Sequence, residues 1–290
     1  MRRTAGCIGI FLAPVLLFGC ETIDIGGTGI AQHLGMLNTA AVNVQKASRE
    51  ITDEEEYYVG RAVAARILAL YPLSENAQLT EYVNAMGLAL SLQSEKPFTY
   101  GGYHFAVLDT PEVNAFACPG GIIFVTRGMI RAAANEDQLA AVLAHEIAHV
   151  SHRDGIAAIS KARWTEALTV IGAKAVREYG PHEVAQLAGI FEGAIEDVFR
   201  TVVVDGYSTS QERQADQKAV GLLAKTGYDA AALKELLAAI PERDRESGGM
   251  LTTHPPTQER IETVAAVQPD GKADPALVRK RSNRFRAAVR

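Results

Sequence analysis

Two histidines four residues apart, His145 and His149, with Glu146 directly after the first, are the residues of this sequence best placed to do chemistry. In an α-helix, residues four apart lie on one face, so both imidazoles would point the same way. Two imidazoles in this arrangement can bind one zinc ion, and the carboxylate next to them then lies beside the metal rather than on it. This pattern is typical of zinc metallopeptidases. The alternative is a buried helix whose histidines only make hydrogen bonds within the core.

The residues around this motif predict the helix that must carry it, from about residue 136 to residue 153. Asn135 is a suitable N-cap, Gln138 could close a capping box with it, and Gly155 is placed to end the helix. The apolar residues recur at helical spacing, which predicts a largely buried helix. They are Leu139, Val142, Leu143 and Ile147.

A third ligand could come from Glu212, which opens another predicted helix together with Asp216. The two acids are four residues apart and share a face. Glu212 therefore fits as the ligand that completes a site of two histidines and one glutamate, and Asp216 could orient a ligand histidine by hydrogen bonding. The alternative is a solvated pair of acids on a helix surface.

A turn between two predicted strands, residues 103–108 and 120–126, is a candidate for substrate binding. Pro119 suggests that the segment lies at a sheet edge. An exposed edge strand beside a metal site can bind an extended peptide by backbone pairing, while a plain hairpin is the alternative. We expect Cys118 to be a small buried side chain. The candidate substrate-binding residues are Asn114, Ala115, Phe116 and Ala117.

The rest of the chain predicts an α+β fold that is predominantly helical. Two scaffold helices are expected at about residues 52–71 and 76–92, and a long, mostly helical stretch follows at residues 156–204. Charged residues interrupt that stretch, so no run in it reaches the length of a membrane span.

The first nineteen residues have the pattern of an export signal: Arg2 and Arg3 precede an apolar run at residues 8–18. The run ends in Leu-Phe-Gly-Cys, which resembles a bacterial lipoprotein box and implies cleavage before Cys20 and acylation of that cysteine. Phe18 is bulkier than the residue usual there, and an ordinary secretory signal is the alternative. Residues 20–51 would form a tether. By resemblance to lipoprotein sorting, Glu21 favours the outer membrane over the inner one.

Charge and cysteine content limit the remaining possibilities. The 29 basic and 34 acidic residues give a net charge of -5, which offers no case for nucleic-acid binding. If Cys7 leaves with the signal and Cys20 carries lipid, Cys118 is the last thiol and no intramolecular disulfide can form. The C-terminal tail, residues 266–290, is basic; it could touch anionic lipid, or it could be a solvated or frayed tail.

Four motifs occur together in a fixed order: Asn-Ala-Phe-Ala-x-Pro-Gly-Gly from residue 114, His-Glu-x-x-His from residue 145, Glu-x-x-Ala-Asp from residue 212 and His-Pro-Pro-x-x-x-Arg from residue 254. Together they resemble the gluzincin peptidases of family M48, which include HtpX, the Oma and CAAX prenyl proteases and the periplasmic BepA- and LoiP-like lipoproteins. The resemblance covers about residues 52–264. Cys118 and the pair Ser151 and His152 depart from the apolar residues expected at those positions.

This resemblance implies a zincin-like peptidase domain over residues 52–265, with a small antiparallel sheet beside the zinc helix. It implies one zinc ion per chain. His254 is then expected near the metal, where it covers the zinc or helps stabilise the transition state, and Arg260 is expected to brace the acidic residues around the ligands. The absence of a membrane-spanning pair and the short tail favour the single-domain lipoprotein branch.

The resulting functional hypothesis is a zinc-dependent metalloendopeptidase in which Glu146 acts as general base and then general acid. The expected substrates are unfolded or misassembled proteins of the cell envelope, on the periplasmic side of a membrane to which the lipid anchors the chain. One alternative is a chaperone or assembly factor whose metal site is latched by His254. Another is a lipoprotein that binds zinc only structurally, through a closed site with four protein ligands.

Overall fold

The computed structural model describes residues 50–159, 163, 191–239, 253–254, 258–267 and 274–289, all within one compact unit, Asn43–Arg290. The signal peptide, Cys20, the tether and most of the stretch 160–190 expected from the sequence lie outside these residues. The elements are α2 (Asp53–Leu70), α3 (Ala77–Ser91), β1 (His104–Leu108), β2 (Ala115–Cys118), η1 (Pro119–Gly121), β3 (Ile122–Thr126), α4 (Arg127–Ala132), α5 (Glu136–His152), α6 (Asp154–Ala157), η2 (Arg200–Asp205), α9 (Thr209–Lys225), α10 (Ala232–Ala239), α12 (Gln258–Ala266) and α13 (Pro275–Val289).

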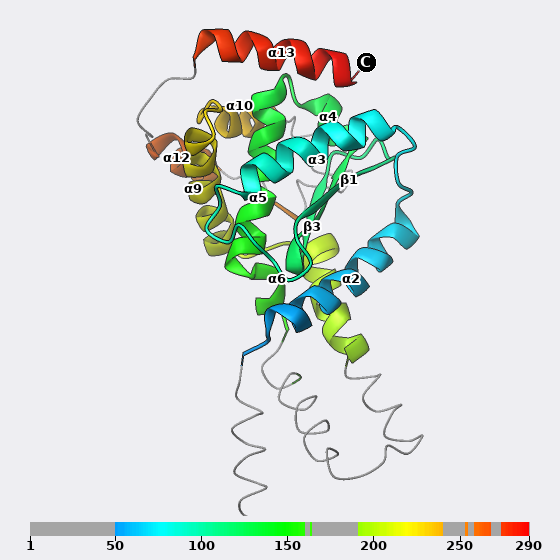
Figure 1. The fold of residues 1–290 in the computed structure, drawn as a ribbon. Coiled ribbons are helices and arrows are strands. Elements are labelled where there is room, and N and C mark those ends of the chain that lie inside the picture. Colours follow the sequence, from blue (N-terminus) through cyan, green and yellow to red (C-terminus); the bar gives the residue numbers. More distant parts are fainter. Residues whose placement is uncertain are drawn as a thin grey trace, which may run out of the picture. The chain divides into compact units, whose positions relative to one another are not determined.

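The helix that carries His145 and His149 is α5, the centre of the fold (Figure 1). Every residue from Glu136 to Val150 is buried, because α3, α9, α10, α13 and the sheet all pack around it. One core cluster joins the apolar residues of α5 to α3, α9 and α10, and a second joins α2 to the sheet and to the helical residues 191–199. The sequence predicted a largely buried helix, and in the structure α5 is buried on all its faces as far as Val150.

The two ends of α5 differ in detail from the sequence prediction. The side chain of Asn135 accepts a hydrogen bond from the Gln138 N–H, but the Gln138 side chain accepts from the backbone of Ala134, so the predicted capping box is not closed. The helix ends at Arg153 rather than at Gly155, and Arg153 adopts a left-handed conformation with φ 59°. Its guanidinium lies 2.9 Å from the buried carboxylate of Glu56 and donates to the carbonyl of Ile51, and these contacts hold this unusual backbone.

The small sheet beside α5 is mixed rather than purely antiparallel. Its strand order is β1-β3-β2, with β2 and β3 antiparallel and β1 and β3 parallel. The direction of β1 differs from the prediction because β3 lies between β1 and β2, so the chain must cross over to reach it. β2 is an edge strand, yet its four residues are buried, and η2 and α5 pack against it.

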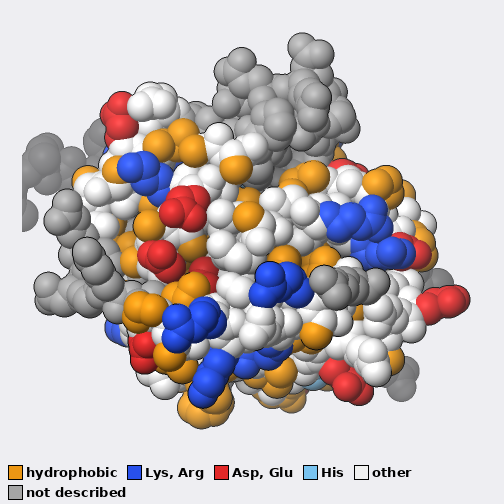
Figure 2. Space-filling view, turned by 90° about the horizontal axis from the view of Figure 1, so that it is seen from above, with side chains coloured by type: hydrophobic (Ala, Val, Ile, Leu, Met, Phe, Trp, Pro, Cys, Tyr) orange, Lys and Arg blue, Asp and Glu red, His pale blue; other side chains and the backbone are white. Residues whose placement is uncertain are grey.

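The basic C-terminal segment folds into α13, which lies across the N-terminal end of α5 (Figure 1). Arg281 is buried and pairs with Asp137 at 2.8 Å, and Arg284 pairs with Glu136. The expectation of a solvated tail is therefore wrong for Arg281, which is buried, whereas Arg284 pairs with a buried acid but stays exposed. Other cations of α13 are exposed as well (Arg279, Lys280 and Arg286), and basic side chains lie among hydrophobic ones on the face seen in Figure 2.

None of the helices in the described part of the chain is both long enough and apolar enough to cross a lipid bilayer.

Candidate metal centre

Four side chains from three separate segments meet beneath the surface. His145 and His149 come from α5, Glu212 comes from the first turn of α9, and His254 comes from the short described segment before α12. One ligand atom from each lies within 4.8 Å of all the others. All four side chains are almost completely buried, with at most 2% of each residue exposed.

The spacing of His145, His149 and Glu212 fits a metal ion. The two Nε2 atoms are 3.1 Å apart, and the Glu212 oxygens lie 3.4 Å from that of His145 and 3.3 Å from that of His149. Around a tetrahedral ion with bonds of about 2.0–2.1 Å, neighbouring ligand atoms are about 3.3–3.4 Å apart. The two imidazoles and the Glu212 carboxylate, which turns one oxygen toward each ring, are therefore spaced about as neighbouring ligands of one ion would be.

The partners of the Nδ1 atoms explain why the Nε2 atoms of the two histidines can bind a cation. Nδ1 of His145 lies 3.0 Å from Asp216, and Nδ1 of His149 lies 2.7 Å from Asp154. A nitrogen next to a carboxylate carries the proton, so in each neutral ring the Nε2 atom presents a lone pair. Two lone pairs and the Glu212 carboxylate then point at the same place. These electron-rich atoms repel one another unless a cation or protons lie between them.

The acidic surroundings favour positive charge at the histidines. Burial lowers the pKa of His145, but its hydrogen bonds to Asp216 and Glu212 outweigh burial and raise that pKa to about 10. Burial likewise lowers the pKa of His149, and the hydrogen bond to Asp154 makes the net shift upward. The pKa of Glu212 is lowered, because the charge of His254 and the bonds from both α5 histidines outweigh its burial. A divalent metal ion is a natural replacement for protons held in this way.

Arg260, on α12, joins the parts of the centre to one another. Its guanidinium binds Asp216 through two bonds of 2.8 and 2.7 Å and lies 2.9 Å from an oxygen of Glu212. It also donates to the carbonyl of His254 at 2.9 Å. Burial raises the pKa of Asp216, but the bond from Arg260 outweighs it and the net shift is downward. Both acids that the sequence predicted for the site, Glu212 and Asp216, thus contact the buried guanidinium of Arg260.

Glu146 is the exception among these charged groups. It is fully buried, and neither of its carboxylate oxygens has a hydrogen-bond partner among the described residues. Its nearest described cation-forming neighbour is His254, whose Nε2 lies 3.8 Å away. A buried carboxylate without partners is costly in free energy, so it indicates a group kept for a reaction rather than for stability.

His254 lies at the fourth corner of the cluster. Its Nδ1 is 2.7 Å from Glu212 and 3.3 Å from Nε2 of His145. The side chain therefore lies where a fourth ligand or a substrate group would have to be. In this arrangement the centre is closed to solvent.

Sequence reasoning missed three residues that support His149. Asp154 binds its Nδ1, Gln211 donates to the other oxygen of Asp154 at 3.2 Å, and the ring of Tyr207 stacks on the imidazole at 4.1 Å between centroids. Asp154 follows the end of α5, and only the left-handed turn at Arg153 directs it back. An acid five residues beyond the second histidine was the one available signal for it.

The predicted substrate-binding residues lie in and just before the edge strand β2, which packs against α5. Asn114 precedes the strand; its side chain accepts from the N–H of Ala115 and donates to Glu112. Phe116 and Cys118 belong to the core cluster that also contains Tyr207. Burial raises the pKa of the Cys118 thiol, and the charge of Glu146 adds to the rise, so this thiol stays protonated near the centre.

Comparison with known families decides the relationship. The model of peptidase family M48 matches residues 74–268, which include all four residues of the cluster. The chain belongs to peptidase family M48. This confirms the resemblance drawn from the motifs, and the mostly helical fold with its small sheet beside the metal helix agrees with it.

Individual M48 relatives are more distant. The chain is 28% identical over 261 residues to the beta-barrel assembly-enhancing protease of Yersinia pestis, covering 88% of this chain and 51% of that protein. It is 28% identical over 214 residues to the protein of the same name from Escherichia coli K12, with 71% and 42% covered. The mitochondrial metalloendopeptidase OMA1 of Schizosaccharomyces pombe is 28% identical over 169 residues, with 57% and 47% covered. The chain thus spans about half the length of these relatives.

Proposed function

We propose that this M48 protein is a zinc-dependent endopeptidase. The observation that carries the proposal is the pairing of two features in one buried place. Two imidazoles and a carboxylate have the spacing of neighbouring metal ligands, and beside them stands a second carboxylate, Glu146, that no described group hydrogen-bonds. Two imidazoles and a carboxylate are donors that suit zinc, and three protein ligands leave a position for chemistry.

His145, His149 and Glu212 would hold the metal, and when bound it would supply Lewis-acid chemistry to a water molecule and a peptide carbonyl. Glu146 would accept the proton of the attacking water and then donate it to the leaving amine, acting as base and acid in turn. Asp216 and Asp154 would keep the two imidazoles oriented, and Arg260 would hold Asp216 and Glu212 in place.

His254 would have two states in this scheme. At rest it covers the fourth corner, so a substrate can enter only after the short segment that carries it has moved. In the open state its ring could donate a hydrogen bond to the oxygen that becomes negative as the carbonyl is attacked. Arg260 would couple a movement of His254 to the metal ligands, because it donates to the backbone carbonyl of His254 and also contacts Glu212.

The proposed substrates are unfolded or misassembled polypeptides of the cell envelope. The export signal and the names of the bacterial relatives support this location. An extended substrate would pair with the backbone of the edge strand β2; because the residues of β2 are buried, η2 would have to move first. We further propose that acylated Cys20 anchors the chain on the periplasmic side of the outer membrane, with residues 20–51 as a tether to the peptidase domain that follows.

A chaperone with a latched metal site is the less favoured alternative, because it gives no role to the unpartnered Glu146. Casein degradation by wild type and Glu146→Gln, with zinc content measured on both, separates the two. Cleavage by wild type alone at equal zinc supports the peptidase. Equal activity of both proteins would overturn the role of Glu146, and absence of zinc from both would overturn the metal centre.

A further inference from the structure

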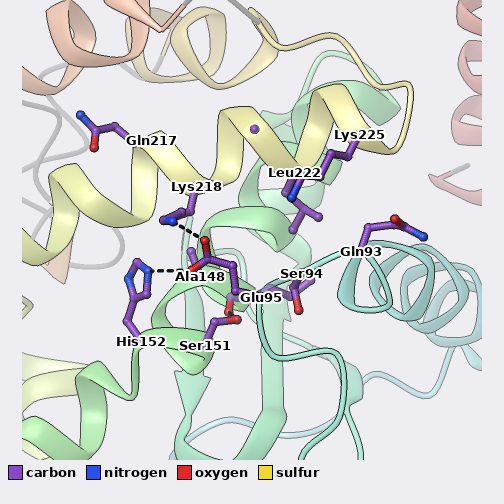
Figure 3. A pocket seen from close by; sticks show the side chains of 12 residues that line it. Gln93, Ser94, Glu95, Ala148, Ser151, His152, Gln217, Lys218, Leu222 and Lys225 are labelled. Atoms are coloured by element: carbon purple, nitrogen blue, oxygen red, sulfur yellow. Dashed lines mark hydrogen bonds and ion pairs between the residues drawn. The ribbon is translucent and has the colours of Figure 1, made fainter.

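A pocket of about 170 Å³ lies against α5 and is lined by none of the four residues of the metal cluster. Its walls come from the C-terminal half of α5, from α9 and from the loop that follows α3 (Figure 3). Ala148, Ser151 and His152 line it from α5, and at 100° per residue they face away from Glu146. The pocket therefore lies beside the proposed reaction site, within one helical turn of His149.

Gly221 makes this pocket possible. It lies in the interior of α9, where glycine costs about 1 kcal/mol relative to alanine. A Cβ added there would meet no atom within 4 Å, so no tight packing requires a glycine. Because Gly221 lines the pocket, the space that its missing side chain leaves open belongs to the pocket. A larger side chain would fill it without displacing the backbone.

The polar groups around the pocket favour an anion. Lys218 and His152 already face the carboxylate of Glu95, which leaves that acid compensated. Lys225 lies on the α9 wall about two turns beyond Lys218, with its amine directed toward the pocket (Figure 3), and the described residues supply no carboxylate within salt-bridge distance of it. Lys225 is thus the cation available to a ligand.

The floor of the pocket is apolar, with Ile147, Ala148 and Leu222 on it. The volume is below the range of about 300–1,000 Å³ that is usual for drug-sized ligands, so it suits a single side chain. We propose that this pocket binds the free C-terminal carboxylate of a polypeptide whose last side chain is apolar. The carboxylate meets Lys225, and the side chain occupies the space beside Gly221.

This site deepens the proposed function by giving the substrate a second attachment point, and only that consequence rests on the proposed function. A chain held by its end close to α5 has a raised effective concentration at the metal centre. Polypeptides with free, accessible C-termini would then be preferred over folded proteins, in which the terminus is tied down.

The test measures binding in the full zinc-loaded chain carrying Glu146→Gln, so that nothing is cleaved and the result does not depend on peptidase activity. The probe is a fluorescein-labelled peptide ending in phenylalanine, either as the free acid or as the C-terminal amide, followed by anisotropy. We expect the free acid to bind about fivefold more tightly than the amide, since the pairing with an exposed lysine is modest. Lys225→Gln should remove that preference.

Two substitutions at one position provide the matched control. Gly221→Leu fills the pocket and should weaken binding of the free acid more than tenfold, whereas Gly221→Ala adds only a Cβ and should leave binding close to that of the parent. Equal affinity for acid and amide, or a preference that survives Lys225→Gln, would overturn the carboxylate assignment. Binding of both peptides that is unaffected by Gly221→Leu would overturn the pocket itself.

Discussion

Acidic side chains are buried at both ends of α5, but the two ends differ in whether these acids have hydrogen-bond partners. At the N-terminal end, Glu136 accepts from the hydroxyls of Tyr82 and Tyr228 and from Arg284, and Asp137 accepts from Arg281 and a backbone N–H. At the metal end, Glu146 has no hydrogen-bond partner among the described residues, and His254 faces it at 3.8 Å. The acids at one end are satisfied by hydrogen bonds, and the acid at the other end is not.

This difference supports the proposal that one end serves stability and the other serves chemistry. Satisfied buried charges fix one arrangement of the helices, and removal of one partner leaves the other uncompensated. An unsatisfied buried carboxylate contributes nothing to stability, so its presence needs another reason. The two ends should therefore respond oppositely to the same kind of substitution.

Replacing one acid at each end gives the largest contrast. Glu146→Gln should lower the cleavage rate about 10²- to 10⁴-fold, the usual contribution of a general base, with zinc content unchanged. Its stability should be equal to that of the wild type or higher, because a partnerless charge is removed. Glu136→Gln should do the reverse, lowering the free energy of unfolding while leaving metal binding intact. A destabilised Glu146→Gln would contradict the comparison; urea unfolding and metal analysis decide.

The ion pair between α13 and α5 should dominate stability at the N-terminal end. Arg281→Met leaves Asp137 buried without its guanidinium and should cost about 3 kcal/mol in urea unfolding. Arg286→Met, on the exposed face of the same helix, serves as the control and should change stability by less than about 0.5 kcal/mol. Equal stability of the two variants would mean that α13 does not hold this end of α5.

At the metal end, the hydrogen bond that His149 donates to Asp154 should affect metal affinity more than stability. Asp154→Asn should weaken zinc binding about 10- to 100-fold, as loss of a partner behind a ligand histidine generally does. Competition with a chelating dye measures this affinity. Gln211→Ala, which removes only the support of Asp154, should have a smaller effect of the same sign. Unchanged affinity in Asp154→Asn would show that the left-handed turn at Arg153 has no role in the centre.

The smallest effect is expected from a single hydroxyl. Tyr82→Phe removes one of several bonds to Glu136, the one with a length of 2.8 Å, and should cost about 1 kcal/mol of unfolding free energy. Catalytic rate and zinc content should stay at wild-type values. A loss of metal in this variant would show that the two ends of α5 are coupled rather than independent.

Much of the metal centre was predictable because it depends on local geometry. The spacing of His145 and His149 places both on one face of any helix that forms there, and Glu212 and Asp216 share a face for the same reason. The cap at Asn135 and the strand residues around Ile122–Thr126 are likewise properties of a few neighbouring residues. The predicted span 136–153 is confirmed to within a residue, but the residue that ends the helix is Arg153 rather than Gly155, because Glu56, far away in the sequence, stabilises the left-handed Arg153.

The sequence by itself therefore determined which side chains could bind a metal and how they lie along their helices. The tertiary structure alone decided that His254 closes the fourth corner, that Asp154 turns back onto His149, that β1 runs parallel to β3, and that α13 pairs with the start of α5. The physical reason is that each of these depends on packing between chain segments distant in sequence or on the path of a connection. Periodicity within one segment carries no information about either.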